Sequence, residues 1–168
     1  MILRPVLGTL GILTASAIAL PACSAQTPAP APTQSETDWQ DVPLAPGTWV
    51  YREDDRGSLA LYGEPNEAAV FLVRCNRVDR RIFFSVAGNL ESASGTMAFQ
   101  ATHGAKSYAA QNSSGSELYV VTATDATDDY LDTIAFSRGR IAITVTGQPL
   151  ITIPTWPEMT RIFEDCRA

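Results

Sequence analysis

Residues 69–87 read AVFLVRCNRVDRRIFFSVA. Two runs rich in Val, Ile, Leu and Phe, 69–75 and 81–87, flank the polar segment 76–80, a pattern typical of a β-hairpin. A parallel pair would need a long crossover between its strands, and this spacing leaves no room for one. The stretch therefore predicts two adjacent antiparallel strands.

Similar short runs continue on both sides of this hairpin. They lie at 48–52, 59–62, 96–102, 107–110 and 118–122, and each is bounded by a Gly-, Asn- or Asp-containing turn. Further along, Ile141, Ile143 and Val145 alternate with smaller residues, and a turn containing Gly147 leads to a run at 150–153. Regular spacing of runs and turns predicts an antiparallel β-sheet in a sandwich-like meander.

Two helices are expected near the C-terminus. Leu131, Ile134 and Ala135 follow helical spacing, with Asp128 as N-cap and Gly139 just past the end, which predicts about three turns. Thr155 and Glu158 have the spacing of a capping box. The second helix then presents one apolar stripe, formed by Met159, Ile162, Phe163 and Cys166. The fold class predicted is α+β.

The chain begins with a short basic start, an apolar run over residues 6–20 and small residues before Cys23. This layout indicates an export signal, and the Leu-Pro-Ala-Cys sequence resembles the cleavage box of bacterial lipoprotein signals. We expect a signal peptide at 1–22, a disordered Pro/Ala-rich tether at 23–46 and one domain at 47–168. Cys23 would carry the lipid (palmitate or a similar acyl chain), and cleavage after Ala25 is the alternative.

Export also bears on the other cysteines and on charge. Cys75 and Cys166 remain beyond Cys23, and an oxidising compartment favours their pairing, with two buried free thiols as the alternative. Without the signal the chain has 11 basic and 18 acidic residues, a net charge of −7. Such a domain is not expected to bind nucleic acid through a general positive field.

Three C-terminal segments carry a family resemblance: Ala135–Arg140 (AFSRGR), Pro154–Glu158 (PTWPE) and Glu164–Arg167 (EDCR). They resemble the ends of a family of uncharacterised alphaproteobacterial envelope proteins. The order of helix, Gly-Gln-Pro hairpin and helix is also similar to the end of periplasmic proteins of the invasion-associated locus B type. These resemblances imply an envelope location and the disulfide, and they imply no catalytic activity.

The densest group of basic residues lies around the turn of the first hairpin and consists of Arg74, Arg77, Arg80 and Arg81. Arginine binds carboxylate and phosphate groups bidentately, so these residues are candidates for binding an anionic glycan or lipid. The alternative is that they pair with the chain's own acids.

No catalytic motif is found. The single histidine, His103, is expected at an exposed hairpin tip, and no Gly-x-Ser-x-Gly elbow exists for a Ser-His-acid triad. The acids between Asp125 and Asp132 lack the alternate spacing and the glycine of a calcium loop. Glu53, Asp54 and Asp55 are best explained as a solvated turn. We expect no metal or cofactor.

The sequence thus favours a lipid-anchored envelope protein that faces the periplasm, with a partner-binding or structural role. Its partners would be the membrane, through the lipid, and an envelope protein or an anionic glycan or lipid. The alternatives are a soluble periplasmic binder of anionic ligands, through the arginines, and a cell-wall hydrolase. The sequence specifies neither the membrane, inner or outer, nor the oligomeric state.

Overall fold

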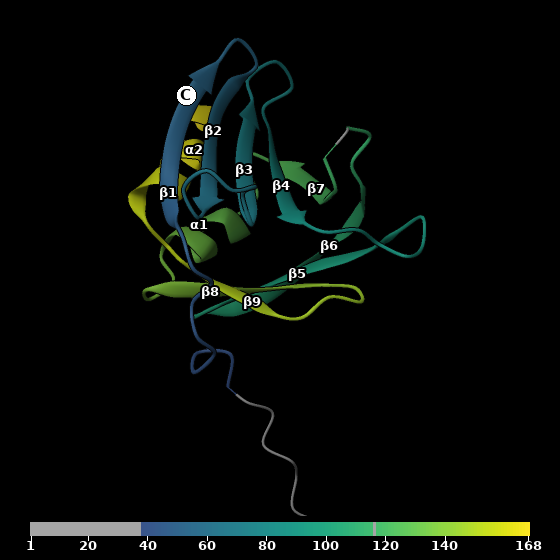
Figure 1. Cartoon of the computed structure of the whole chain (residues 1–168). Coiled ribbons are helices and arrows are strands. Elements are labelled where there is room, and N and C mark those ends of the chain that lie inside the picture. The colour runs from purple at the N-terminus through teal and green to yellow at the C-terminus, as the bar shows by residue number, and fades with distance from the viewer. Residues whose placement is uncertain (1–37, 116) are drawn as a thin grey trace, which may run out of the picture. The chain divides into compact units, whose positions relative to one another are not determined.

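The computed structural model describes residues 38–115 and 117–168 (Figure 1). The expected signal peptide, Cys23 and the first part of the expected tether lie outside these residues. The described residues form nine strands and two helices. The elements are β1 Thr48–Asp54, β2 Gly57–Gly63, β3 Phe71–Asn76, β4 Arg81–Ala87, β5 Gly95–Ala101, β6 Gly104–Asn112, β7 Tyr119–Asp125, α1 Tyr130–Ala135, β8 Arg140–Val145, β9 Ile151–Pro154 and α2 Pro157–Arg167.

All neighbouring strands are antiparallel, in the order β1-β2-β3-β4-β7-β6-β5-β8-β9. β6 and β7 pair only at Gln111↔Val121 and Asn112↔Val120. The sheet turns there, so β5, β6, β8 and β9 cross the direction of β1–β4 and the whole forms a half-barrel (Figure 1). The predicted antiparallel α+β fold is confirmed.

The hairpin β3–β4 shows why this sequence forms a sheet. Phe71, Val73 and Cys75 are buried on one face of β3, and their neighbours in sequence are only half-buried. The period of two matches the alternation of side chains along a strand. Arg80 completes the turn in a left-handed conformation, with φ 52°.

The core lies inside the half-barrel, between the crossing strands and α2. Phe84 of β4 is central, with its ring centroid 4.8 Å from that of Phe99 and 6.2 Å from that of Phe163. All three side chains are almost fully buried. Complete burial of each stabilises the fold by roughly 1.5–3 kcal/mol, so this cluster joins β4, β5 and α2.

The chain before β1 brings the two edges of the sheet together. Ala45 N donates to Thr152 O at 2.8 Å, and Thr152 Oγ1 donates to Pro43 O at 2.8 Å. Trp49 Nε1 of β1 donates to Pro154 O of β9 at 2.9 Å. These bonds place Pro43 and Ala45 against β9, ahead of the predicted boundary at residue 47, which stays a prediction.

The first helix is shorter than predicted, because α1 spans six residues and not three turns. Asp128 is not its N-cap residue, although its Oδ1 accepts a hydrogen bond from Tyr130 N at 2.9 Å. After Ala135 the chain turns away, and Ser137 Oγ donates to Arg140 O at 2.6 Å. This local bond replaces a continuation of the helix.

The second helix begins at Pro157, as expected for a residue without an N–H. The predicted capping box is wrong, since Trp156 is the N-cap residue and makes no side-chain cap bond. Thr155 Oγ1 donates instead to Ser137 O at 3.0 Å. The predicted apolar stripe of α2 is buried.

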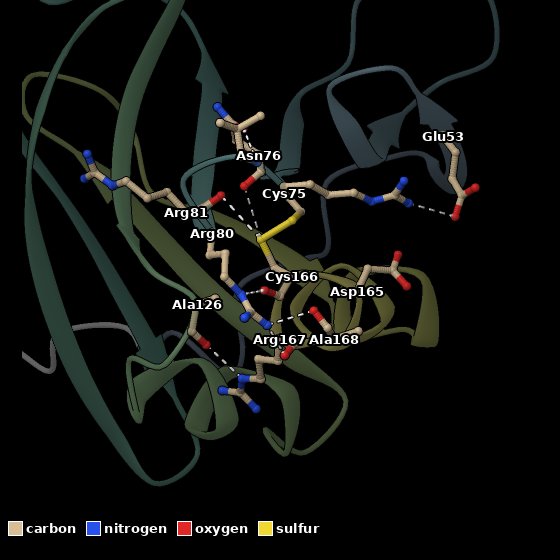
Figure 2. The surroundings of a disulfide bond; sticks show 12 residues. Glu53, Cys75, Asn76, Arg80, Arg81, Ala126, Asp165, Cys166, Arg167 and Ala168 are labelled. Carbon is tan, nitrogen blue, oxygen red and sulfur yellow. Dashed lines mark hydrogen bonds and ion pairs between the residues drawn. A yellow bond between two sulfur atoms is a disulfide. The ribbon is translucent and has the colours of Figure 1, made fainter.

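Cys75 and Cys166 form the expected disulfide, with an S–S distance of 2.07 Å (Figure 2). It joins β3 to the last turn of α2. Arg80 reinforces the same junction, because its Nε donates to Cys166 O at 3.3 Å and its Nη2 to Ala168 O at 2.7 Å and to Arg167 O. In the described part of the chain, neither helix is long and apolar enough to cross a membrane.

Candidate functional site

The three C-terminal segments Ala135–Arg140, Pro154–Glu158 and Glu164–Arg167 meet in space. Arg140 pairs with Pro154 across β8 and β9, and Thr155 N donates to Gly139 O at 3.4 Å. Residues 135–140 thus lie beside residues 154–158. Both segments, together with Glu164 of the third, contribute to one groove of about 580 Å³. That volume is within the range typical of small-molecule sites.

The groove runs along the exposed side of α2. Its lining residues are Tyr51, Ala135, Thr155, Pro157, Glu158, Thr160, Arg161 and Glu164. Its walls therefore combine one strand of the sheet, the end of α1 and the first two turns of α2.

Two large exposed aromatic residues are next in sequence to residues that line the groove. Phe136, next to Ala135, is 75% exposed, and Trp156, between Thr155 and Pro157, is 44% exposed. Single exposed apolar residues are common on protein surfaces. Here, however, segments 135–140 and 154–158 each contain one exposed aromatic residue. Exposed aromatic residues are typical of binding surfaces.

Arg161 and Tyr51 form the polar part of the groove. The guanidinium Cζ of Arg161 lies 4.0 Å from the centroid of the Tyr51 ring, a cation–π contact. At its other end, the Tyr51 hydroxyl lies 2.7 Å from Glu53 Oε1 and 2.8 Å from Asp165 Oδ2. Burial, then these carboxylates, raise the pKa of Tyr51 well above its usual value. Tyr51 therefore stays neutral, and it positions Arg161 without acting as a base.

Arg161 makes no ion pair and no side-chain hydrogen bond with any other described residue. Two carboxylates share the groove with it. Glu164 is exposed, and Glu158 is half-buried with an Oε2 atom that has no hydrogen-bond partner among residues 38–115 and 117–168. The groove thus offers one free guanidinium beside two acids.

The residue that a Ser-His-acid triad would need lies away from the groove. His103 is exposed in the turn between β5 and β6, and it does not line the groove. No group of three or more His, Cys, Asp or Glu side chains within the described ranges could hold a metal ion.

The acids near α1 have structural partners. Asp128 accepts hydrogen bonds from Lys106 Nζ and Thr124 Oγ1 at 2.8 and 2.6 Å. Burial acts to raise the pKa of Asp128, but the hydrogen bonds from Lys106, Thr124 and the Tyr130 N–H prevail and lower it to about 2. Asp132 pairs with Arg167 at 2.7 Å.

Among the described residues, three of the four arginines at the β3–β4 hairpin have ionic or hydrogen-bonded partners, and Arg81 has only an aromatic ring nearby. Arg74 pairs with Asp54 at 2.9 Å and Arg77 with Glu53 at 3.4 Å. Arg80 binds carbonyls at the end of α2, and Arg81 lies 5.8 Å from the centroid of the Phe83 ring. Only Arg77 and Arg80 line a common cavity, of about 280 Å³. Anion binding by this group stays a prediction.

The sequence did not indicate the groove itself. Phe136, Trp156 and Glu164 lie in the three segments that carry the resemblance, and that was their only signal. Tyr51 and Arg161 gave none, because their contact depends on how α2 packs on β1. No protein-family model, curated protein or solved structure matches the chain.

Proposed function

We propose that the chain is an exported, lipid-anchored protein of the cell envelope, and that its folded domain binds a partner or ligand in the groove beside α2. The observation that carries the binding role is the groove's composition. Two exposed aromatic residues are next in sequence to residues that line it, and one arginine without an internal acceptor lies in its wall. Such side chains dominate binding energy where proteins meet their partners.

Two features support the cellular address. The first is the sequence before Cys23, which has the composition of a lipoprotein signal. The second is the Cys75–Cys166 disulfide, since structural disulfides persist in oxidising compartments and are rare in the cytosol. The Pro/Ala-rich residues after Cys23 suit a spacer between lipid and domain.

The anchor is tested by detergent-phase partitioning of the exported chain. The native chain should enter the detergent phase, and Cys23→Ala should remain in the aqueous phase. Equal partitioning of both would contradict lipidation at Cys23. A mature N-terminus at Gln26 would instead indicate cleavage after Ala25 and a soluble protein.

The binding role is tested by truncating the aromatic rim. Phe136→Ala with Trp156→Ala should reduce recovery of envelope partners crosslinked to the native chain, without changing the thermal midpoint, because both side chains are exposed. Val78→Ala is the matched control, since Val78 is 92% exposed at the hairpin tip far from these segments in sequence. Unchanged crosslinking in the double variant would contradict a role for the groove.

The other two functions have less support. A soluble binder acting through the hairpin arginines would need guanidinium groups free to meet a ligand, and Arg74, Arg77 and Arg80 have internal partners. A cell-wall hydrolase would need a positioned acid and base, and Glu53 and Asp54 are each held by other side chains.

A further inference from the structure

We infer that Arg161 is the anchor of a carboxylate-binding site, and that the groove takes a ligand in which a carboxylate lies next to an apolar or aromatic group. This inference rests on the proposed binding role of the groove and specifies its ligand. Three observations support it: the stacking of Arg161 on Tyr51, the lack of an ion pair between Arg161 and any described acid, and the residues that line the groove.

Arg161 is already positioned for a ligand. Its guanidinium is stacked on the Tyr51 ring, and Tyr51 is in turn fixed at its hydroxyl by Glu53 and Asp165. Ordering a long side chain normally costs free energy on binding. Here the stacking contact already restricts the Arg161 side chain, so a ligand loses less free energy in ordering it. The N–H donors of the planar guanidinium remain available.

Three acids lie close to Arg161 on its own helix, yet none of them pairs with it. Glu158, Glu164 and Asp165 lie three or four positions away on α2, where helical ion pairs commonly form. Asp165 is instead bound to the Tyr51 hydroxyl, and no carboxylate oxygen lies within ion-pair distance of Arg161 among the residues that the structure describes. By contrast, Arg167 on the same helix binds Ala126 O and Asp132.

The surroundings favour a carboxylate over a phosphate. A guanidinium binds either group bidentately, but Glu158 and Glu164 in the same groove would repel a dianion more than a monoanion. The same two acids can accept hydrogen bonds from N–H, ammonium or hydroxyl groups elsewhere in the ligand.

The rim supplies the apolar part of the site. Phe136 and Trp156 are exposed on the segments that contribute Ala135, Thr155 and Pro157 to the groove. Aromatic rings of this kind bury large apolar area at low entropic cost. A peptide with an apolar residue at its free C-terminus, or an acidic conjugate of similar shape, has the required chemistry.

The test is a nuclear magnetic resonance titration of the purified full chain carrying Cys23→Ala, which keeps it out of membranes. The probes are N-acetylphenylalanine and its amide, which differ only in the carboxylate. We expect the acid to shift the Trp156 indole N–H and the Arg161 Nε–H resonances saturably. The amide should bind at least tenfold more weakly, because a charge-assisted bidentate pair is lost.

Variants connect the effect to Arg161. Arg161→Gln should weaken binding of the acid at least tenfold and leave the amide unchanged, and Arg161→Lys should give an intermediate affinity because it keeps charge without the fork. Arg56→Gln is the control, since the Arg56 side chain is 73% exposed and does not line the groove. Unchanged amide spectra away from residue 161 verify that each variant is folded.

The outcomes separate the inference from the proposed function. Equal affinity for acid and amide, or an Arg161→Gln variant that binds the acid normally, would overturn the carboxylate site and leave a binding groove. If neither probe shifts Trp156 or Arg161, the carboxylate site is overturned as well. Crosslinking that depends on Phe136 and Trp156 then decides whether the groove binds anything.

Discussion

Replacing the disulfide, by Cys75→Ala with Cys166→Ala, should lower the free energy of unfolding by about 4.5 kcal/mol. The bond joins residues 91 positions apart, and the chain-entropy model gives this value for a loop of that length. The loop runs from β3 to the last turn of α2 and so contains most of the domain. Without the bond, the unfolded chain has more conformational entropy, and the folded state is less stable relative to it.

The change in the thermal midpoint follows from this value. A domain of about 130 residues has an unfolding entropy of roughly 0.27 kcal/mol per kelvin. A loss of about 4.5 kcal/mol then corresponds to a fall of about 16 °C in the midpoint. Calorimetry of the oxidised native chain, the reduced native chain and the double variant measures it directly.

Cys23→Ala is the matched control, because it removes a cysteine outside the described domain, and its midpoint should equal that of the native chain. The reduced chain and the double variant should both unfold at the lower temperature. A fall of under about 4 °C in both would refute the reasoning, because the chain-entropy effect would then be largely absent.

Three further predictions concern single side chains. Asp128→Asn should cost about 2 kcal/mol, since Asp128 accepts charge-assisted hydrogen bonds in a half-buried site. Because the pKa of Asp128 is lowered to about 2, its contribution is complete above about pH 4 and is lost as the pH falls through 2. Urea midpoints of native chain and variant should therefore converge toward pH 2, and a constant difference would contradict this. Arg80→Ala should destabilise by about 1–2 kcal/mol by removing hydrogen bonds to the end of α2. Arg80→Gly should recover up to about 1 kcal/mol of that loss, because Arg80 has φ 52°, and urea unfolding with glycine less stable than alanine would argue against this strain. Trp49→Phe should cost about 1–3 kcal/mol by leaving Pro154 O without its donor, and hydrogen exchange of the Ala45 amide should accelerate. An unaltered rate there would mean that the two sheet edges are joined independently of Trp49.

Much of the fold could be predicted because its determinants are local. The β3–β4 hairpin follows from two apolar runs and a polar turn, and the buried stripe of α2 follows from residues within one helix. For both elements, the sequence neighbours that set the pattern also decide the structure. The disulfide joins residues 91 positions apart, and its prediction rested on the number of cysteines and on the expected export of the chain.

Predictions failed where distant partners compete for the same group. Thr155 has the residue type and spacing of a capping box, but its hydroxyl binds Ser137 O in the folded chain. α1 is short because the segment after Ala135 forms bonds with Thr102 and Arg140. Pro43 and Ala45 form bonds with Thr152 of β9, which no local pattern in their sequence indicates.

The groove was beyond sequence reasoning for the same reason. Tyr51 and Arg161 meet only because the apolar side of α2 packs on the sheet and its polar side then faces β1. Whether an arginine is free or paired depends on the whole set of neighbours. Of the arginines around Cys75, Arg74 and Arg77 pair with acids, whereas Arg161 stacks on Tyr51 and forms no ion pair with any described residue.

The central claim, an exported and lipid-anchored domain, is tested most directly by the intact mass of the native chain extracted from membranes. The account predicts a polypeptide that begins at Cys23, carries acyl groups on that residue and lacks the thiol hydrogens of Cys75 and Cys166. A polypeptide that retains residues 1–22, with all three thiols free and unmodified, would contradict it.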